Sequence, residues 1–437
     1  MKESLRLGKN SLWLTAARIG AQALALLTLL LARKLGSAGF GEYAFFTTAI
    51  FVANVLTTCG TDMYFIREIA ARDDLARLPA ALCIQLLLSG LFILAALVAA
   101  PALPNQSAAS LLALQIYSLS LLPMAFYSVF TTALRGRQQM AGYALLNLAG
   151  AALQALVVLL FIAVADGIVT LAVLLLAAQV IAALLAGWLC ARQINGFWRG
   201  WRFSWPDVRA VFLASASLAL LGVLGMFYQK AAVLVLGTLT SAALTGFYAS
   251  ALRVVEASKL FHLAVLTALY PLMAQAEPSG PAADAIRRSW KGLLAGAVAL
   301  AVGLSLLAGP VVDLLYGAAF APAAPVLRIL AWTLVPYTVS SFLTLAFIAS
   351  NRPRAVGWAL TVSLIGLGLL SLCWIPAYGL SGAAWAALSA EILQAVLLLL
   401  QAQASQDLQK RFSFVPARPR WGVNFLNFLV KMIKEIA

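Results

Sequence analysis

Three charged side chains recur at three-residue intervals within one apolar run: Arg253, Glu256 and Lys259. On a helix with 3.6 residues per turn, they share one face within about 120°. A charged residue at the centre of a membrane helix costs about 2.5–3.5 kcal/mol on insertion scales, so we expect this face to turn toward a polar interior. Arg binds phosphate through paired hydrogen bonds and Lys as a point charge. The net basic face predicts a site for an anionic group, unless Glu256 only neutralises its neighbours and fixes helix packing.

Two further basic residues, Arg18 and Lys230, lie inside apolar runs. We expect both to join Arg253 and Lys259 in contacting the anionic ligand. Each lies about two helical turns from a span end, so the alternative is that its long side chain reaches out to the headgroup region.

Acidic residues accompany these cations. Glu391 lies near the middle of an apolar run, and Asp62 lies at the end of another. We expect Asp62, Glu256 and Glu391 to pair with the cations or to bind a counter-ion, because unpaired intramembrane charges are costly. For Asp62 the alternatives are a helix cap or a pair with Arg67, and Asp313 is interpreted as structural.

The sequence contains few residues that could bind a metal ion or a cofactor. His262 is the single histidine, and packing or hydrogen bonding is favoured over a proton switch. The four cysteines are too far apart to form a metal-ligand pair, and we interpret them as small apolar residues. No glycine-rich phosphate loop is present, so no cofactor is expected.

These residues sit in a chain dominated by apolar runs. Of its 437 residues, 63% are hydrophobic and 10% are charged. Because a bilayer core about 30 Å thick needs roughly 20 apolar residues per helix, the sequence predicts an all-α polytopic membrane protein with about twelve transmembrane helices. The expected spans are 11–32, 40–58, 79–100, 108–131, 141–164, 168–190, 210–236, 245–272, 291–315, 326–349, 355–375 and 382–401.

The connections between spans alternate between basic and nearly uncharged. Because basic loops stay in the cytoplasm, this alternation predicts that both termini are cytoplasmic. The formal charge of +15 therefore reflects membrane topology, and nucleic acid is not expected as a partner. Spans occupy nearly the whole chain, which leaves no room for a sizeable soluble domain.

Short matches at an offset of about 205–215 residues indicate a tandem repeat. The matched positions are Gly41 with Gly246, Pro123 with Pro336, Gly142 with Gly357, Gly167 with Gly379, and Gln179 with Glu391. We expect two pseudo-symmetric six-helix lobes around a central cleft, with residues 1–207 as the first lobe and 208–404 as the second. Since each repeat has an even number of spans, the two would be parallel repeats about an axis along the membrane normal. Residues 405–437 would form a cytoplasmic tail with an amphipathic helix near 425–436.

The sequence resembles the bacterial polysaccharide lipid-carrier flippases of O-antigen type, within the multidrug/oligosaccharidyl-lipid/polysaccharide exporter superfamily. The resemblance rests on Leu-Gly-Lys-Asn-Ser-Leu-Trp-Leu at 7–14 and Ala-Arg-Lys-Leu-Gly-Ser-Ala-Gly-Phe-Gly-Glu-Tyr at 32–43. Cys-Gly-Thr-Asp at 59–62, Arg-Glu-Ile-Ala at 67–70, Gly-Phe-Tyr at 246–248 and Leu-Tyr-Pro-Leu-Met at 269–273 extend it along the chain.

This resemblance implies that the protein moves undecaprenyl-pyrophosphate-linked oligosaccharides across the bacterial inner membrane by alternating access through a cationic cleft. Arg18, Lys230, Arg253 and Lys259 would then contact the pyrophosphate. Membrane lipids, a polysaccharide polymerase and chain-length machinery are the implied partners. The stretch Tyr-Gln-Lys-Ala-Ala at 228–232 lacks the acidic residue that many relatives carry there, so ion coupling is not expected at that position.

Three other functions are alternatives. A peptidoglycan-precursor or other polymer flippase and a multidrug exporter share the superfamily, although cationic drugs suit acidic clefts better. A membrane-embedded glycan polymerase or acyltransferase would need acidic or histidine residues in a sizeable loop at the membrane face. The loops here are too short for that, so an enzyme is not expected.

Overall fold

The computed structural model describes Gly20, Leu24 and residues 27–164, 166–198, 200–275 and 281–405. Throughout these residues the secondary structure is helical, with two short 3₁₀ turns and no strand. The predicted all-α class is therefore confirmed. The first predicted span and the tail helix near 425–436 lie mainly or wholly outside the described residues.

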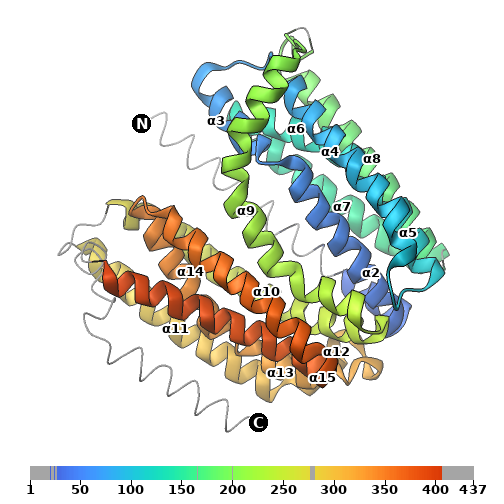
Figure 1. Cartoon of the computed structure of the whole chain (residues 1–437), viewed down its shortest axis with the longest axis vertical. Helices are drawn as coiled ribbons and strands as arrows, with labels where there is room; N and C mark the ends of the chain where they lie inside the picture. Colours follow the sequence, from blue (N-terminus) through green and yellow to red (C-terminus); the bar gives the residue numbers. More distant parts are fainter. Residues whose placement is uncertain are drawn as a thin grey trace. The chain divides into compact units, whose positions relative to one another are not determined.

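The described residues up to Gly246 form one compact unit. Its helices are α2 (Thr28–Thr58), α3 (Thr61–Arg72), α4 (Leu78–Ala99), α5 (Ala108–Ser118), α6 (Leu121–Gly136), α7 (Met140–Val164), α8 (Ile168–Gln193) and α9 (Trp205–Leu239), drawn in blue to green in Figure 1. Helix α9 packs against α2, α3 and α4. The predicted lobe boundary at residue 207, which is based on the repeat, remains a prediction.

From Phe247 the chain forms a second compact unit. Its helices are α10 (Ala242–Gln275, beginning in the first unit), α11 (Pro281–Leu306), α12 (Ala308–Tyr316), α13 (Ala323–Ala331), α14 (Leu334–Ala349) and α15 (Pro353–Ala404). Within this unit α14 packs against both α15 and α11, and α13 packs against the same two helices.

Eight of the described helical segments are long and apolar enough to cross a membrane, or nine when the bent pair α13 and α14 is taken as one span. Helix α15 has 52 residues and bends at Gly379, where φ is 55° and ψ is −127°. Because one span needs roughly 20 residues, α15 is long enough for the last two predicted spans. Helix α10 has 34 residues and carries the charged ladder within its length.

Connections of the first unit contact one another at two places, and the predicted topology remains a prediction. At one of them Lys34, a basic residue that breaks the predicted charge alternation, has its Nζ 3.0 Å from Asp166 Oδ1. Basic connections meet elsewhere, through Arg137 Nε at 2.7 Å from Asp73 Oδ1. There Arg202 N also donates to Ala76 O at 2.9 Å. Loops expected on the same side of the membrane therefore contact one another.

Matched repeat positions adopt matched local structure. Pro123 and Pro336 are each the third residue of a helix that follows a break, at the starts of α6 and α14. Proline fits there because the N–H groups of a first helical turn have no intrahelical acceptor. Gly167, with φ of 86°, and Gly379, with φ of 55°, each make the turn between consecutive spans. The breaks were not predicted, although the prolines beside them were singled out.

A close backbone contact joins another repeat-matched pair, Gly41 and Gly246, both in the first unit. A Cβ on Gly41 would overlap the carbonyl oxygen of Ala242, and one on Gly246 would overlap the carbonyl oxygen of Ser37. Small residues permit such close approach of membrane helices. These two glycines therefore fix how the start of α10 crosses α2.

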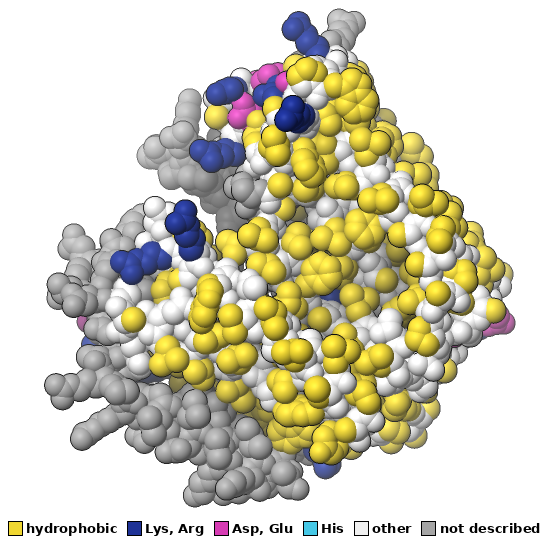
Figure 2. All heavy atoms as spheres, viewed as in Figure 1, with side chains coloured by type: hydrophobic (Ala, Val, Ile, Leu, Met, Phe, Trp, Pro, Cys, Tyr) yellow, Lys and Arg dark blue, Asp and Glu magenta, His cyan; other side chains and the backbone are white. Residues whose placement is uncertain are grey.

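Hydrophobic side chains cover most of the face shown in Figure 2, while Lys and Arg gather in a few groups toward its margins. Leu184, Leu91 and Leu369 are among the exposed apolar residues, with exposed fractions of 68%, 61% and 60%. A surface of this kind is stable against lipid tails and not against water. The protein is a multi-pass membrane protein.

Candidate substrate site

The charged ladder lies on α10 as the three-residue spacing predicts. Arg253, Glu256 and Lys259 are all half-buried. Lys259 is 17 residues from the first residue of α10 and 16 from the last. At 1.5 Å per residue it lies about 25 Å from either end of the helix, close to the middle of α10.

Lys259 pairs across helices. Its Nζ lies 3.7 Å from Glu391 Oε1 on α15 and 4.0 Å from the centroid of the Tyr337 ring on α14. A tight ammonium–carboxylate hydrogen bond is about 2.7–2.9 Å long, so this pair is loose. The ammonium is held by a carboxylate and by the face of an aromatic ring together.

Glu391 is only partly satisfied by this contact. The residue is 9% exposed, and among the described residues its Oε2 has no hydrogen-bond partner. Leaving a buried acceptor unpaired costs about 1–3 kcal/mol, more for a charged group. Such groups call for an explanation, and a Lys that changes partner during function would supply one.

His262 lies one helical turn beyond Lys259 and is 7% exposed. Its Nε2 lies 3.0 Å from Ser341 Oγ, while that hydroxyl donates to Tyr337 O at 2.6 Å. Since a hydroxyl has one hydrogen, His262 Nε2 is the donor to Ser341. The ring also packs against Tyr337, with centroids 5.6 Å apart. His262 thus has the hydrogen-bonding and packing role favoured by the sequence.

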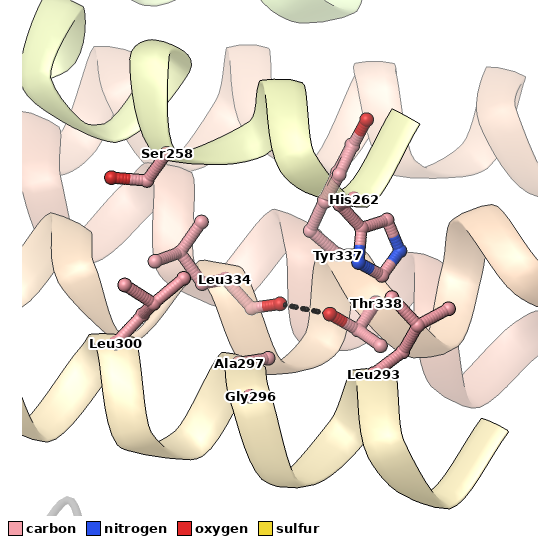
Figure 3. A pocket seen from close by; sticks show the side chains of 9 residues that line it. All are labelled: Ser258, His262, Leu293, Gly296, Ala297, Leu300, Leu334, Tyr337 and Thr338. Carbon is pink, nitrogen blue, oxygen red and sulfur yellow. Dashed lines mark hydrogen bonds between the residues drawn. The ribbon is translucent and has the colours of Figure 1, made fainter. Parts of the chain in front are cut away.

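A small hollow borders this polar cluster, between α10, α11 and α14 (Figure 3). We call it the α10–α11–α14 hollow. Its lining residues are Ser258, His262, Leu293, Gly296, Ala297, Leu300, Leu334, Tyr337 and Thr338. Tyr337 belongs both to the hollow and to the Lys259 cluster, so the two features adjoin.

The predicted residues of the first unit lie in different surroundings. Asp62, in the first turn of α3, pairs with Arg135 at 3.9 Å, and Arg135 also lies over the Tyr143 ring at 5.4 Å. The partner is thus Arg135 on α6 and not the suggested Arg67. Lys230 is half-buried on α9, and Arg18 lies outside the described residues. The structure brings Lys259 and Glu391 together and leaves Asp62 in a separate pair.

Tyr337 and Ser341 were not singled out from the sequence. They lie four residues apart on α14, just after the break and Pro336, so both face the same neighbours. The available signal in the sequence was Pro336, which matches Pro123 and directly precedes Tyr337. By contrast, the side-chain amides of Gln115 and Asn147 donate to the backbone oxygens of Leu97 and Tyr143.

A bundle of long apolar helices with broken spans and an ion pair near mid-span is typical of membrane transporters. The profile of the polysaccharide biosynthesis protein family matches residues 7–277, more than half of the chain. The chain belongs to this family. Among proteins of curated function, none matches the sequence significantly.

Solved structures share the fold at low sequence identity. An inward-facing multidrug resistance MATE family transporter of the MOP superfamily is 16% identical with a TM-score of 0.75, covering 89% of this chain and 96% of that one. The lipid II flippase MurJ, in an inward closed conformation, is 13% identical with a TM-score of 0.69, covering 89% and 87%. A MOP superfamily transporter from Pyrococcus furiosus Vc1, described as having a binding pocket of reverse polarity, is 16% identical with a TM-score of 0.59, covering 91% and 95%.

Proposed function

We propose that this protein carries undecaprenyl-pyrophosphate-linked oligosaccharide repeat units from the inner to the outer leaflet of the bacterial inner membrane, by alternating access, for an O-antigen-type surface polysaccharide. The observation that carries the proposal is Lys259, a cation midway along α10 and paired with Glu391, in a protein of the polysaccharide biosynthesis family. A pyrophosphate is the anionic part of such a substrate that this cation would meet.

The geometry of the Lys259 cluster suits an exchange of anions. The 3.7 Å pair with Glu391 is loose, so a phosphate oxygen at hydrogen-bond distance would bind Lys259 more tightly than the carboxylate does. Glu391 would hold Lys259 while the site is empty, and Glu256 would do the same for Arg253. In this proposal Arg18, Lys230, Arg253 and Lys259 contact the pyrophosphate in turn, and Asp62 supports the first unit through Arg135.

The direction of transport follows from charge. Moving an anion outward down an inside-negative potential releases about 2.3 kcal/mol per charge for each 100 mV. A pyrophosphate therefore leaves the cytoplasmic leaflet without ATP. With both termini in the cytoplasm, the basic connections of the first unit would face the leaflet from which the substrate departs. A polymerase and chain-length machinery would take over the unit on the far side.

The test is a deletion strain whose lipids are extracted after the leaflet of each lipid-linked glycan has been determined. We expect a complete pyrophosphate-linked repeat unit to accumulate on the cytoplasmic side, and wild-type protein to reverse this. Delivery of the unit to the outer leaflet without this chain would reject the glycan-flippase function. The accumulated lipid also identifies its sugar by mass, and an accumulated peptidoglycan precursor would point to that substrate instead.

A multidrug exporter is the second candidate, because the fold resembles a MATE transporter with a TM-score of 0.75. Cationic drugs call for a net negative site. The ladder on α10 has two cations and one carboxylate, which favours an anion. Unchanged drug sensitivity of the deletion strain, measured for a panel of organic cations, would remove this candidate.

A further inference from the structure

Three of the polar side chains that line the α10–α11–α14 hollow have hydrogen-bond partners within the protein. Thr338 Oγ1 donates to Leu334 O at 2.8 Å, the bond drawn in Figure 3. Ser258 Oγ donates to Val254 O at 3.0 Å, and His262 Nε2 donates to Ser341 Oγ. These three groups therefore need no further hydrogen bond. The rest of the wall consists of three leucines, Ala297, the backbone of Gly296 and the Tyr337 side chain. Apolar spaces of this kind stay dry and take apolar groups.

Gly296 on α11 makes the space. No atom lies within 4 Å of the position that a Cβ on Gly296 would occupy, so close helix packing does not require glycine here. Glycine inside a helix is less favourable than alanine by roughly 0.5–1 kcal/mol. What the missing side chain provides is room in the hollow. The cavity volume is about 20 Å³ and the hollow is partly open, so only the first carbon atoms of a chain fit inside it.

The position of the hollow determines what kind of chain can enter. Tyr337 has its ring on Lys259 at 4.0 Å and also lines the hollow. A ligand with an anion on Lys259 would thus have the first part of an attached apolar chain beside Tyr337. Lys259 lies about 25 Å from each end of α10, whereas the phosphate of a bilayer phospholipid stays at the interface. Only a lipid whose phosphate enters the middle of the protein can use both features.

From these observations we propose that the α10–α11–α14 hollow binds the phosphate-proximal end of the prenyl chain of the transported lipid. This inference rests on the proposed function, because it uses Lys259 as the phosphate ligand. It adds a second recognition element, since the site selects a phosphate attached directly to an apolar chain over a free phosphate or a free sugar.

The experiment uses the full chain in phosphatidylcholine nanodiscs and a photoactivatable farnesyl pyrophosphate as the probe. Cross-linked peptides are identified by mass spectrometry. In the wild type we expect labelling of α11 near Gly296 and of α14 near Tyr337. Gly296→Leu fills the hollow, and we expect the probe concentration for half-maximal labelling to rise at least about tenfold, as losing the burial of a few methylene groups implies.

Gly303→Leu is the matched control, because Gly303 lies two turns further along α11 and also has open space in place of a Cβ. We expect it to label as the wild type does. Competition separates the possible sources of the chain. Unlabelled farnesyl pyrophosphate should displace the probe, and phosphatidylglycerol at the same excess should not. Equal displacement by phosphatidylglycerol would make the hollow a bilayer-lipid site and overturn the inference.

Inorganic pyrophosphate binding distinguishes the two proposals. Lys259→Met should weaken it and Gly296→Leu should leave it unchanged. If Gly296→Leu labels normally while Lys259→Met loses pyrophosphate, the hollow assignment fails and the proposed function stands. If Lys259→Met binds pyrophosphate as tightly as the wild type does, the phosphate site itself is wrong. An absence of wild-type labelling at α11 and α14 would also overturn the inference.

Discussion

The two units share a repeated scaffold but differ in charge at its middle. At the offset of 205 residues that relates Gly41 to Gly246, Lys259 corresponds to Asn54. At the offset of 212 that relates Gly167 to Gly379, Glu391 corresponds to Gln179. The second unit thus has an ion pair where the first has two neutral amides. The turns at Gly167 and Gly379 are matched in the two copies, whereas this ion pair is present in only one of them.

The largest effect is expected from a substitution at the close backbone contact between the matched glycines Gly41 and Gly246. Gly41→Leu would force a side chain into the carbonyl oxygen of Ala242, and the helices would have to separate. We expect loss of most monodisperse protein after detergent extraction, measured by size-exclusion chromatography. Gly150→Leu is the control, since no atom lies within 4 Å of its Cβ position. Equal yields for both variants would contradict the packing role of Gly41.

The difference in charge is tested by replacing Lys259 and Glu391 with the neutral residue types found at the matching positions of the first unit. Lys259→Asn alone leaves Glu391 buried without its cation, and breaking a buried pair typically costs about 3–5 kcal/mol. We expect a clearly lowered melting temperature in detergent. The double variant Lys259→Asn with Glu391→Gln should recover most of that loss, because neither charge remains.

Transport should separate from stability in the same variants. The double variant should fold and still fail to export glycan, since the cation for the phosphate is gone. Export by the double variant at the wild-type rate would show that the charge difference between the units has no role in transport.

The matched turns allow a sharper comparison. At both Gly167 and Gly379 φ is positive, and no atom lies within 4 Å of the Cβ position. The cost of Gly→Ala is therefore backbone strain alone, about 1–3 kcal/mol. We expect Gly167→Ala and Gly379→Ala to lower the melting temperature by similar amounts. A drop at only one site would indicate that the two turns are not equivalent.

The smallest effect is expected at the surface of the first unit. Arg137 forms two hydrogen bonds to Asp73, at 2.7 and 3.1 Å, but the Asp73 side chain is 68% exposed. Exposed pairs contribute about 0.2–1 kcal/mol and are screened by salt. Asp73→Asn should lower the melting temperature slightly at low salt and not at 1 M salt. A large decrease in melting temperature that persists at high salt would mean that Asp73 stabilises the protein by more than its charge interaction with Arg137.

The fold was largely predictable because its signals are local. The lengths of the apolar runs and the basic loops between them predict the helical spans. The spacing of glycine and proline residues predicts the repeat, and the turns at Gly167 and Gly379 agree with it. The breaks before α6 and α14 were missed because apolar periodicity continues across them. The continuity of α15 through Gly379 was missed for the opposite reason, since glycine normally marks an end.

The site was less predictable because it depends on contacts between helices. The three-residue ladder correctly indicated a shared face on α10. The spacing did not predict that Lys259 pairs with Glu391 on another helix. Contacts between helices depend on how each helix is rotated about its axis and shifted along it. The spacing of residues within one segment carries no information about either.

The short turn at Gly379 also limits which reagents can bind this part of the protein. Two membrane-length helices follow one another through a bend inside a single 52-residue stretch, so almost no chain is left over to form a loop. Proteases and antibodies need several extended residues to bind. Limited proteolysis or an inserted epitope at 376–381 would thus be a poor way to map which side of the membrane this end faces. A small thiol reagent directed at a cysteine in place of the exposed Tyr378 is better matched to such a short connection.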